Sequence, residues 1–223
     1  MFGEKVIQFY RNMQTGFALP PGVEVMQPFS RPASAVVTET FYRRFYGDEN
    51  PRTFIIGINP GRFGGGVTGI PFTDPVKLER YCGIANDFPK KTELSADFIY
   101  RVIESFGGAE AFYSKFYFTS ISPLGFTREG VNMNYYDDPV LVKVLDDFMI
   151  RSMETQVDFG TNQLNCICLG SGKNLKQLQR LNERGHFFRN INVLDHPRFI
   201  MQYKRKSLDE YLLRYLSVLA QVQ

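Results

Sequence analysis

Four short stretches carry polar or small residues directly after an apolar run, and chemistry is expected there. They read Gly57-Ile58-Asn59-Pro60-Gly61, Ser120-Ile121-Ser122-Pro123, Gly170-Ser171-Gly172-Lys173 and Asp195-His196-Pro197-Arg198. Asn, Ser and His side chains donate and accept hydrogen bonds, and His also changes its charge near neutral pH. The four stretches therefore offer the polar groups of a ligand pocket, with His196 as a candidate catalytic residue.

The first of these stretches opens a glycine-rich loop. Between Gly57 and Phe72 the chain holds six glycines, which allow backbone N–H groups to approach a ligand closely. The segment from Gly64 to Gly69 formally matches the dinucleotide-binding fingerprint. However, it lies several residues past the apolar run and continues into Pro71, which disfavours a helix at that point. We therefore do not expect a Rossmann cofactor here, and phosphate binding by the loop stays open as an alternative.

The third stretch resembles a P-loop only in part. Ile167 stands where the first Gly of that motif is required, and Asn174 stands in place of Ser or Thr. A plain turn between a strand and a helix is one interpretation. Contact of Gly172 and Lys173 with a DNA phosphate is the other.

The remaining reactive residue types favour ordinary structural roles. His186 is interpreted as a loop residue, and Cys166 and Cys168 lie two apart on an expected buried strand, where they would pack as small apolar groups. Three cysteines are too few for a disulfide framework, which indicates a reducing, cytoplasmic location. No His, Cys and carboxylate cluster has metal spacing, so we expect no metal and no cofactor.

The elements that must position these residues alternate between strands and helices. Continuous apolar runs are typical of strands buried on both faces, and four of them occur here, at residues 53–58, 116–121, 164–169 and 191–194. Asp138-Pro139 predicts the start of a long helix, and Ser207-Leu208-Asp209-Glu210 predicts a capping box. Residues 18–34, with four prolines, are interpreted as an irregular arm.

This alternation predicts a three-layer α/β/α sandwich with a mainly parallel, four-stranded central sheet. Ligands of open α/β sheets bind beyond the carboxyl ends of the strands, which is where the four polar stretches fall. A length of 223 residues fits a single domain spanning residues 1–223. No apolar run is long enough for a membrane span, and the start of the chain does not resemble a secretory leader.

Charge is distributed unevenly along the chain. The formal net charge is only +3, yet nine basic and two acidic residues lie between Lys173 and Lys206. Clusters of Lys and Arg gain free energy on binding phosphates because counterions are released. A phosphate-bearing partner is therefore one interpretation, and a solvated helix face is the other.

The first motif and the final histidine together resemble a known family. The sequence from Gly57 to Gly64, continued by Thr68-Gly69-Ile70-Pro71-Phe72, is similar to the first motif of uracil-DNA glycosylases, above all of their single-strand-selective monofunctional branch. His196-Pro197 resembles the start of the second motif. Glu93-Leu94-Ser95 with Phe98, and Phe118 through Leu124, resemble intermediate segments. The resemblance runs from about Pro28 to Lys206.

The resemblance implies a monofunctional glycosylase that flips a damaged nucleotide out of DNA and hydrolyses its N-glycosidic bond, which initiates base excision repair. Asn59 would orient a water against C1′, and His196 would hydrogen-bond the O2 oxygen of the departing base. Ile58, Gly61 and Phe72 would bind the base, with Phe72 stacked on it. Phe63, Gly64 and Gly65 would complete the pocket. No Lys occupies a matching catalytic position, so no Schiff base and no strand cleavage are expected.

Two positions depart from the family pattern. Ser120 stands where relatives carry an Asn that reads the edge of uracil, and a hydroxyl cannot reproduce both hydrogen bonds of an amide. Gly65-Gly66 stands where relatives place a Met, which would widen the pocket near C5 of the pyrimidine. Both changes favour a broader lesion range, with oxidised uracils and deaminated purines as further candidates.

The segment after His196 is the expected DNA wedge. Arg198 and Phe199 would fill the hole left by the flipped base, and Lys204, Arg205 and Lys206 would hold phosphates, together with Gly172 and Lys173. Alternatively, Phe199 and Ile200 simply pack the last helix onto the sheet. DNA is the expected partner of a monomer. The rival functions are a catalytically weak DNA-binding module on the same scaffold and a nucleotide-binding α/β protein.

Overall fold

The four apolar runs form one sheet in the computed structural model, which describes residues 1–222. All pairings are parallel, and the strand order is β3 (Phe116–Ser120), β2 (Arg52–Gly57), β6 (Thr161–Leu169) and β7 (Asn190–Leu194). This confirms the mainly parallel four-stranded sheet expected from the sequence. The largest difference is in β6, which begins three residues before the expected run because Thr161 pairs with Arg52.

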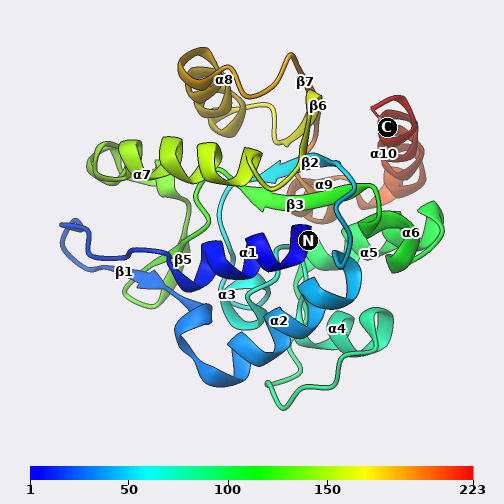
Figure 1. The fold of residues 1–223 in the computed structure, drawn as a ribbon, viewed down its shortest axis with the longest axis horizontal. Coiled ribbons are helices and arrows are strands. Elements are labelled where there is room, and N and C mark those ends of the chain that lie inside the picture. The colour runs from blue at the N-terminus through cyan, green and yellow to red at the C-terminus, as the bar shows by residue number, and fades with distance from the viewer. Residues whose placement is uncertain (223) are drawn as a thin grey trace.

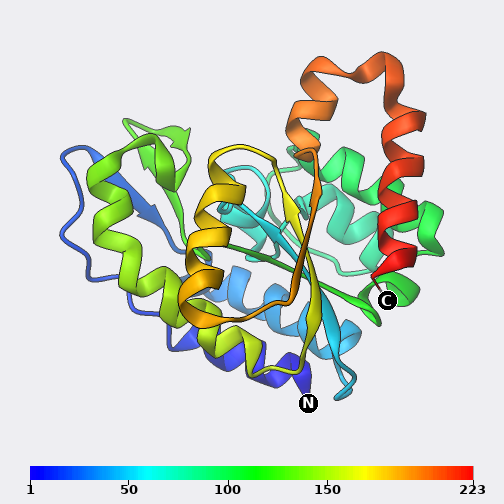
Figure 2. The same ribbon diagram turned by 90° about the horizontal axis from the view of Figure 1, so that it is seen from above.

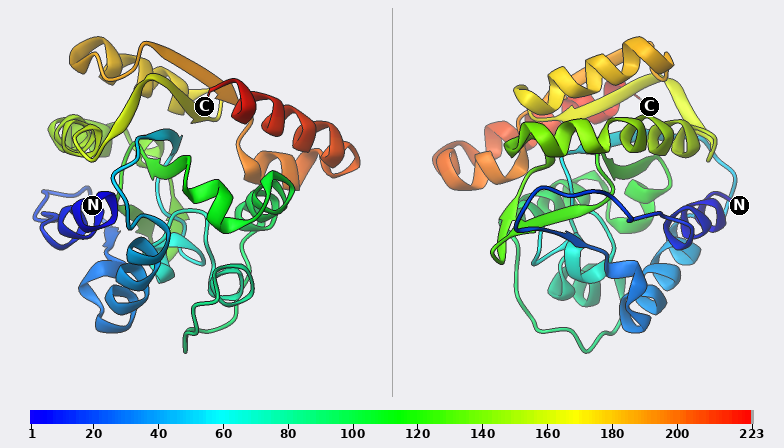
Figure 3. Two further views of the ribbon diagram at one scale, coloured as in Figure 1. Left: turned by 45° about the vertical axis from the view of Figure 1, so that its right-hand side comes forward. Right: turned by 90° about the vertical axis from the view of Figure 1, so that its left-hand side faces the viewer.

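Helices cover both faces of this sheet and confirm the three-layer α/β/α arrangement (Figures 1 and 3). On one side lie α1 (Phe2–Arg11), α2 (Pro32–Phe45), α7 (Pro139–Val157) and α8 (Lys173–Gly185). On the other side lie α5 (Leu94–Phe106), α6 (Ala109–Tyr113), α9 (Pro197–Tyr203) and α10 (Leu208–Gln221), with α4 (Pro75–Cys82) packed beside α5. No helix within residues 1–222 is long and apolar enough to cross a membrane.

Successive residues of each strand face opposite layers, which explains why the runs are apolar throughout. On one face, the Phe54 and Tyr117 rings lie 5.0 Å apart, and Tyr117 contacts Phe2 of α1. On the other face, Ile55 adjoins Ile99 of α5 and Leu219 of α10 around a small apolar void. Both faces of β2 and β3 are therefore buried in packed side chains, whereas the first half of β6 and most of β7 are only partly covered.

A second, smaller sheet lies beside the main one and was not expected. It consists of β1 (Val23–Met26), β4 (Gly125–Arg128) and β5 (Val131–Met133) in antiparallel order β1-β4-β5. The interpretation of residues 18–34 as an irregular arm was therefore wrong in part. Val23-Glu24-Val25-Met26 finds its pairing partner about 100 residues away, in a segment that the local pattern does not identify.

The carboxyl ends of the central strands lie side by side, as expected (Figure 2). Gly57 at the end of β2 is opposite Ser120 at the end of β3. Leu169 is opposite Leu194, and the Gly170 N–H donates to the Leu194 carbonyl over 2.7 Å. The register thus brings the four polar stretches to one edge of the sheet.

The two helix starts expected from the sequence differ in how they are capped. Asp138 accepts hydrogen bonds from the N–H groups of Val140 and Leu141 at the start of α7. Ser207 precedes α10, but its side chain makes no capping hydrogen bond, so the capping box predicted there was wrong. The short helical turn η3 (Arg205–Ser207) leads directly into α10 and leaves Ser207 in a conformation unlike that of a capping residue.

This difference gives a matched pair of stability predictions. Asp138→Ala is expected to lower the free energy of unfolding by about 1 kcal/mol or more, because two N–H groups of α7 lose their acceptor and the Arg128 guanidinium loses its carboxylate partner. Ser207→Ala is expected to change it by no more than a few tenths, because no capping bond is lost. Urea denaturation of both variants measures this, and equal losses would contradict the assigned caps.

Candidate active site

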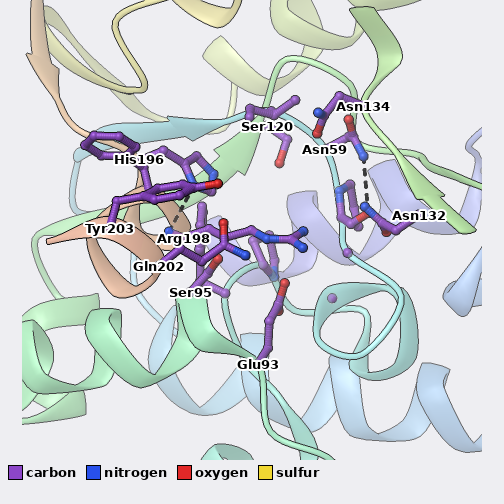
Figure 4. Close-up of a pocket in the computed structure, with 17 residues that line it drawn as sticks. Asn59, Glu93, Ser95, Ser120, Asn132, Asn134, His196, Arg198, Gln202 and Tyr203 are labelled. Atoms are coloured by element: carbon purple, nitrogen blue, oxygen red, sulfur yellow. Dashed lines mark hydrogen bonds between the residues drawn. The ribbon is translucent and has the colours of Figure 1, made fainter. Parts of the chain in front are cut away.

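A cavity of about 290 Å³ opens at the carboxyl ends of the central strands. Its walls come from the ends of β2 and β3, from the loop after β2, from the start of α5, from the small sheet and from α9 (Figure 4). The lining residues are Ile58, Asn59, Pro60, Gly61, Gly65, Pro71, Phe72, Glu93, Ser95, Ser120, Asn132, Asn134, His196, Arg198, Phe199, Gln202 and Tyr203. Asn59 and His196, separated by most of the chain, therefore share one pocket.

The amide of Asn59 is held in a single orientation. Its Oδ1 accepts from the Tyr135 N–H over 3.0 Å, and its Nδ2 donates to the carbonyls of Met133 and Pro60 over 3.2 and 3.3 Å. Both amide hydrogens are therefore used within the protein, whereas Oδ1 keeps a second lone pair. Asn59 can accept a hydrogen bond from a molecule in the cavity but has no hydrogen left to donate.

His196 is held as a neutral hydrogen-bond donor. Its Nδ1 accepts from the Arg198 N–H over 3.2 Å at the start of α9, so the ring proton of the neutral form must reside on Nε2. Burial lowers the pKa of His196 to about 4, and the positive charge of Arg198 acts in the same direction. At neutral pH the pocket therefore contains an Nε2–H donor without a positive charge.

Phe72 forms an aromatic wall of the cavity. Its ring centroid lies 5.1 Å from that of Phe118 and 6.0 Å from that of His196. The backbone of Phe72 is in the left-handed region, with φ of 55°, a conformation that costs a non-glycine residue about 1–3 kcal/mol. A Cβ at position 57 would lie 2.9 Å from Phe72 Cζ, so Gly57 is required for this close approach.

Ser120 lies at the inner end of the pocket. It is 4% exposed, and within residues 1–222 its hydroxyl has no hydrogen-bond partner. The hydroxyl oxygen is not buried from the cavity, so water or a ligand there can bond to it. Ser120 therefore offers one short, rotatable donor and acceptor to whatever occupies the cavity.

Glu93 is the main pocket residue to which the sequence assigned no role. Its carboxylate faces the cavity from the side opposite Ser120 (Figure 4), and neither oxygen has a hydrogen-bond partner among residues 1–222. Burial raises the pKa of Glu93 to about 7, and nearby Asp74 raises it further, while Arg198 opposes the shift. The Glu93 N–H donates to Asp74 Oδ2 over 3.0 Å, which fixes the start of α5.

The two glycines of the first motif make room for this carboxylate. A Cβ at position 61 would lie 2.6 Å from Glu93 Oε1, and one at position 64 would overlap Glu93 Oε2. Gly61 lines the cavity as expected, whereas Gly64 lies beneath Glu93 and does not line it. The sequence predicted a pocket role for both glycines but did not identify the acid that packs on them.

The other expected pocket residues divide between two neighbouring cavities. Ile58 and Gly65 line the first cavity. Phe63 does not, because its ring lies in an adjoining groove and is 38% exposed. The structure therefore places Phe63 beside the first cavity and not in its lining.

The residues expected to form the wedge surround the mouth of the cavity. Arg198 is exposed and lines the pocket, and its guanidinium forms no salt bridge within residues 1–222. Phe199 is 40% exposed, and its ring lies 5.5 Å from that of Tyr203, whereas Ile200 is fully buried. The alternative in which both Phe199 and Ile200 pack the last helix therefore holds for Ile200 alone.

The remaining cations expected to bind DNA lie outside the cavity. Lys204, Arg205 and Lys206 are exposed in the connection between α9 and α10. Gly172 and Lys173 form the exposed start of α8, where Gly172 ends a strand-to-helix turn. Lys173 Nζ lies 5.4 Å from the centre of the Tyr136 ring.

Asn132 and Asn134 were missed because the small sheet was missed. They belong to β5 and the residues after it, which follow a hairpin turn at Glu129 and Gly130. Both turn residues have positive φ, of 52° and 72°, as a two-residue turn of this type requires. The sequence did contain one signal for this hairpin: Gly130 lies between two short segments in which apolar and polar residues alternate.

Comparisons with known proteins agree on one relationship. The family model described as the uracil DNA glycosylase superfamily matches residues 44–220. The structure is similar to the crystal structure of wild-type SMUG2 from Pedobacter heparinus, with a TM-score of 0.96 and 44% sequence identity. That match covers 99% of this chain and 97% of the other. No curated protein matches the chain.

The raised pKa of Glu93 predicts a pH-dependent effect of Glu93→Gln. Folding favours the protonated acid, so the wild type loses stability as pH rises from about 4.5 to about 7, and the Gln variant does not. The variant is expected to be more stable than the wild type by about 1–2 kcal/mol at pH 8. This advantage should vanish near pH 4.5.

Denaturant unfolding across this pH range measures the difference. Glu79→Gln is the matched control, since the Lys90 ammonium beside Glu79 lowers the pKa of that exposed carboxyl, and its replacement should act in the opposite direction. If the difference in stability between Glu93→Gln and the wild type is the same at pH 4.5 and at pH 8, the raised pKa of Glu93 is contradicted.

Proposed function

Because the chain belongs to the uracil DNA glycosylase superfamily, we propose that it is a monofunctional glycosylase that removes uracil from DNA, with other deaminated or oxidised bases as further substrates. Membership places the protein among the DNA glycosylases of base excision repair, and the similarity to SMUG2 confirms the branch expected from the sequence. The observation that carries the finer proposal is the pairing of the fixed Asn59 amide with the neutral His196 donor in one cavity.

The proposed reaction begins with loss of the base. The bond between C1′ and the base nitrogen breaks, its electron pair moves onto the base, and the sugar becomes an oxocarbenium-like cation. The Nε2–H of His196 donates to the O2 oxygen, where negative charge accumulates. A neutral donor suits this step. With a pKa of about 4, the charged imidazolium of His196 loses its extra proton well below neutral pH, whereas the neutral ring keeps its Nε2–H. One such donor contributes roughly 3–4 kcal/mol to the transition state.

Water then completes the hydrolysis. The free lone pair of Asn59 Oδ1 accepts one hydrogen of the water, and the water oxygen attacks C1′. An amide is a weak base, which suffices when the electrophile is already a cation. The water proton passes to the departing base, so one water is consumed and an abasic site remains. The cavity lining among residues 1–222 contains no lysine, and hydrolysis without strand cleavage is part of the proposal.

Substrate binding follows from the same walls. Phe72 stacks on the flipped base, Ile58 and Gly61 contact it, and Ser120 offers a single hydroxyl to its edge. Arg198 and Phe199 fill the hole in the stack, while Gly172, Lys173 and Lys204–Lys206 hold the phosphates. The proposed enzyme acts as a monomer. The single domain over residues 1–223 and a cytoplasmic location complete the proposal.

We predict alkali-labile sites at uracil in single-stranded DNA without added metal.

Loss of either Asn59 or His196 is expected to slow the reaction strongly. Asn59→Ala and His196→Ala should each lower the single-turnover rate about 100-fold or more. Thermal unfolding of both variants serves as the control, since Asn59 also joins two loops. A folded variant with a near-normal rate would contradict the role of the residue it replaces.

Ser120 should determine how strongly uracil is preferred. A hydroxyl cannot form both bonds that an amide makes with the uracil edge, so Ser120→Asn is expected to raise the preference for uracil over xanthine by about fivefold. That gain corresponds to about 1 kcal/mol, the net contribution of one neutral hydrogen bond. Competing excision from two labelled oligonucleotides measures the ratio. Ser122→Asn is the control, because the buried Ser122 hydroxyl bonds to the Leu124 carbonyl and does not line the cavity. An unchanged ratio in Ser120→Asn would contradict this account of the pocket.

A further inference from the structure

A second cavity adjoins the base pocket and has no role in the reaction described above. It is a groove of about 320 Å³ between the loop after β2, the start of α5 and the small sheet. Five residues line both cavities: Gly61, Glu93, Ser95, Asn132 and Arg198. The groove is therefore continuous with the base pocket, and its volume is similar to that of the 290 Å³ pocket in which we place one base.

The outer wall of the groove is an exposed aromatic ring held in place by its neighbours. Phe63 is 38% exposed, and the Arg62 guanidinium lies 4.5 Å from the centre of its ring. The same guanidinium donates to the Gly130 carbonyl of the hairpin turn, and the Arg62 N–H donates to Asn132 Oδ1 over 3.0 Å. Ring and guanidinium together present flat surfaces of the kind on which unpaired bases stack.

Exposed apolar side chains gather around both cavities. Of the large hydrophobic residues exposed among residues 1–222, Phe63 and Val131 line the groove, while Phe199 and Tyr203 line the base pocket. Tyr203 is 71% exposed and Val131 is 66% exposed. Each cavity therefore has its own pair of exposed apolar side chains, and the wedge accounts only for the pair that contains Phe199.

In the part of the chain that the structure describes, no carboxylate lies within salt-bridge distance of the cations around the groove. Arg62, Lys91 and Arg198 form no salt bridge within residues 1–222, and Lys91 Nζ lies 5.2 Å from the centre of the Phe63 ring. By contrast, Arg180 and Arg184 on α8 both pair with Asp146. Cations left unpaired beside an aromatic ring suit the phosphate and the base of a single-stranded nucleic acid.

We propose that this groove binds the unpaired nucleotide that adjoins the flipped one in single-stranded DNA. Phe63 stacks on its base, Asn132 and Ser95 face the polar edge of that base, and Arg62 and Lys91 hold its phosphate. In duplex DNA the adjoining base stays paired and stacked, so the groove fills only when the strand is single. This proposal rests on the proposed glycosylase function and adds a specificity site to it.

Substrates that lack one neighbouring base test the proposal. Uracil is placed in a single-stranded oligonucleotide whose 5′ or 3′ neighbour is replaced by an abasic spacer, which keeps the phosphate. We expect the wild-type single-turnover rate at subsaturating enzyme to fall about tenfold with the spacer on one side and to change little with it on the other. Phe63→Ala should show a similar loss on the intact strand and no further loss with either spacer.

Phe199→Ala is the matched control, since its ring is 40% exposed and Phe199 lines the base pocket but not the groove. Whatever the rate of Phe199→Ala on the intact strand, its single-turnover rate should still fall about tenfold when the same neighbouring base is replaced by the spacer. Affinities of His196→Ala for the same oligonucleotides, measured by fluorescence anisotropy, give a readout that does not need the reaction. They should fall about tenfold with the same spacer.

The possible failures are distinguishable. If uracil is excised from the intact strand and both spacers leave rate and affinity unchanged, the groove does not bind the adjoining base. A Phe63→Ala variant that keeps the full spacer effect would equally overturn the proposal. If no uracil is excised from the intact strand, the proposed function fails, and the affinities of His196→Ala still decide whether the groove binds a neighbouring base.

Discussion

The amide of Asn59 joins two parts of the chain that lie more than 70 residues apart in sequence. Two of its three hydrogen bonds connect the end of β2 to the backbone of Met133, the last residue of β5, and of Tyr135, while the third stays within the loop, at the Pro60 carbonyl. The glycine-rich loop, the hairpin and the end of the central strand are thereby held in one arrangement. Both the base pocket and the adjoining groove lie between these parts, so their shapes depend on this contact.

The same contact explains the chemistry assigned to Asn59. An amide whose hydrogens are both occupied cannot rotate without breaking bonds to two carbonyls, and leaving buried carbonyls unpaired is costly. The acceptor lone pair therefore keeps its direction. Opposite it, His196 is fixed by the Arg198 N–H and kept neutral by burial. A pocket with one fixed acceptor and one fixed donor is organised before the substrate arrives, which is how electrostatic catalysis is achieved.

Glu93 shows how the glycines of the first motif serve a purpose beyond flexibility. Gly61 and Gly64 provide the space in which its carboxylate lies, and burial there raises the pKa of Glu93 to about 7. A partly protonated acid next to the unpaired Arg198 lets the charge of the cavity change near neutral pH. The neutral His196 does not share this sensitivity, because its pKa of about 4 lies well below that range.

The central sheet and most of the base pocket could be predicted from the sequence, whereas the second cavity could not. The four apolar runs identify strands without reference to distant residues, and the parallel arrangement then places Asn59, Ser120 and His196 at one edge. The small sheet depends on pairing between Val23–Met26 and a segment about 100 residues later, which local patterns do not encode.

Residues that reach the site from that sheet or from α5, such as Asn132 and Glu93, therefore needed the structure. The same holds for Phe63. Its spacing in the motif is correct, but its ring faces the adjoining groove because Arg62 is held by the hairpin turn.

The central claim is that a neutral His196 presents its Nε2–H to the oxygen of a departing base. Nitrogen-15 NMR of the imidazole rings tests this directly, because the chain contains only two histidines and the exposed His186 serves as an internal reference. We predict that His196 remains the Nε2–H tautomer from pH 5 to pH 8. On addition of abasic single-stranded DNA and uracil, its N–H proton should shift downfield. A His196 that titrates near pH 6.5, or that carries its proton on Nδ1, would contradict the account.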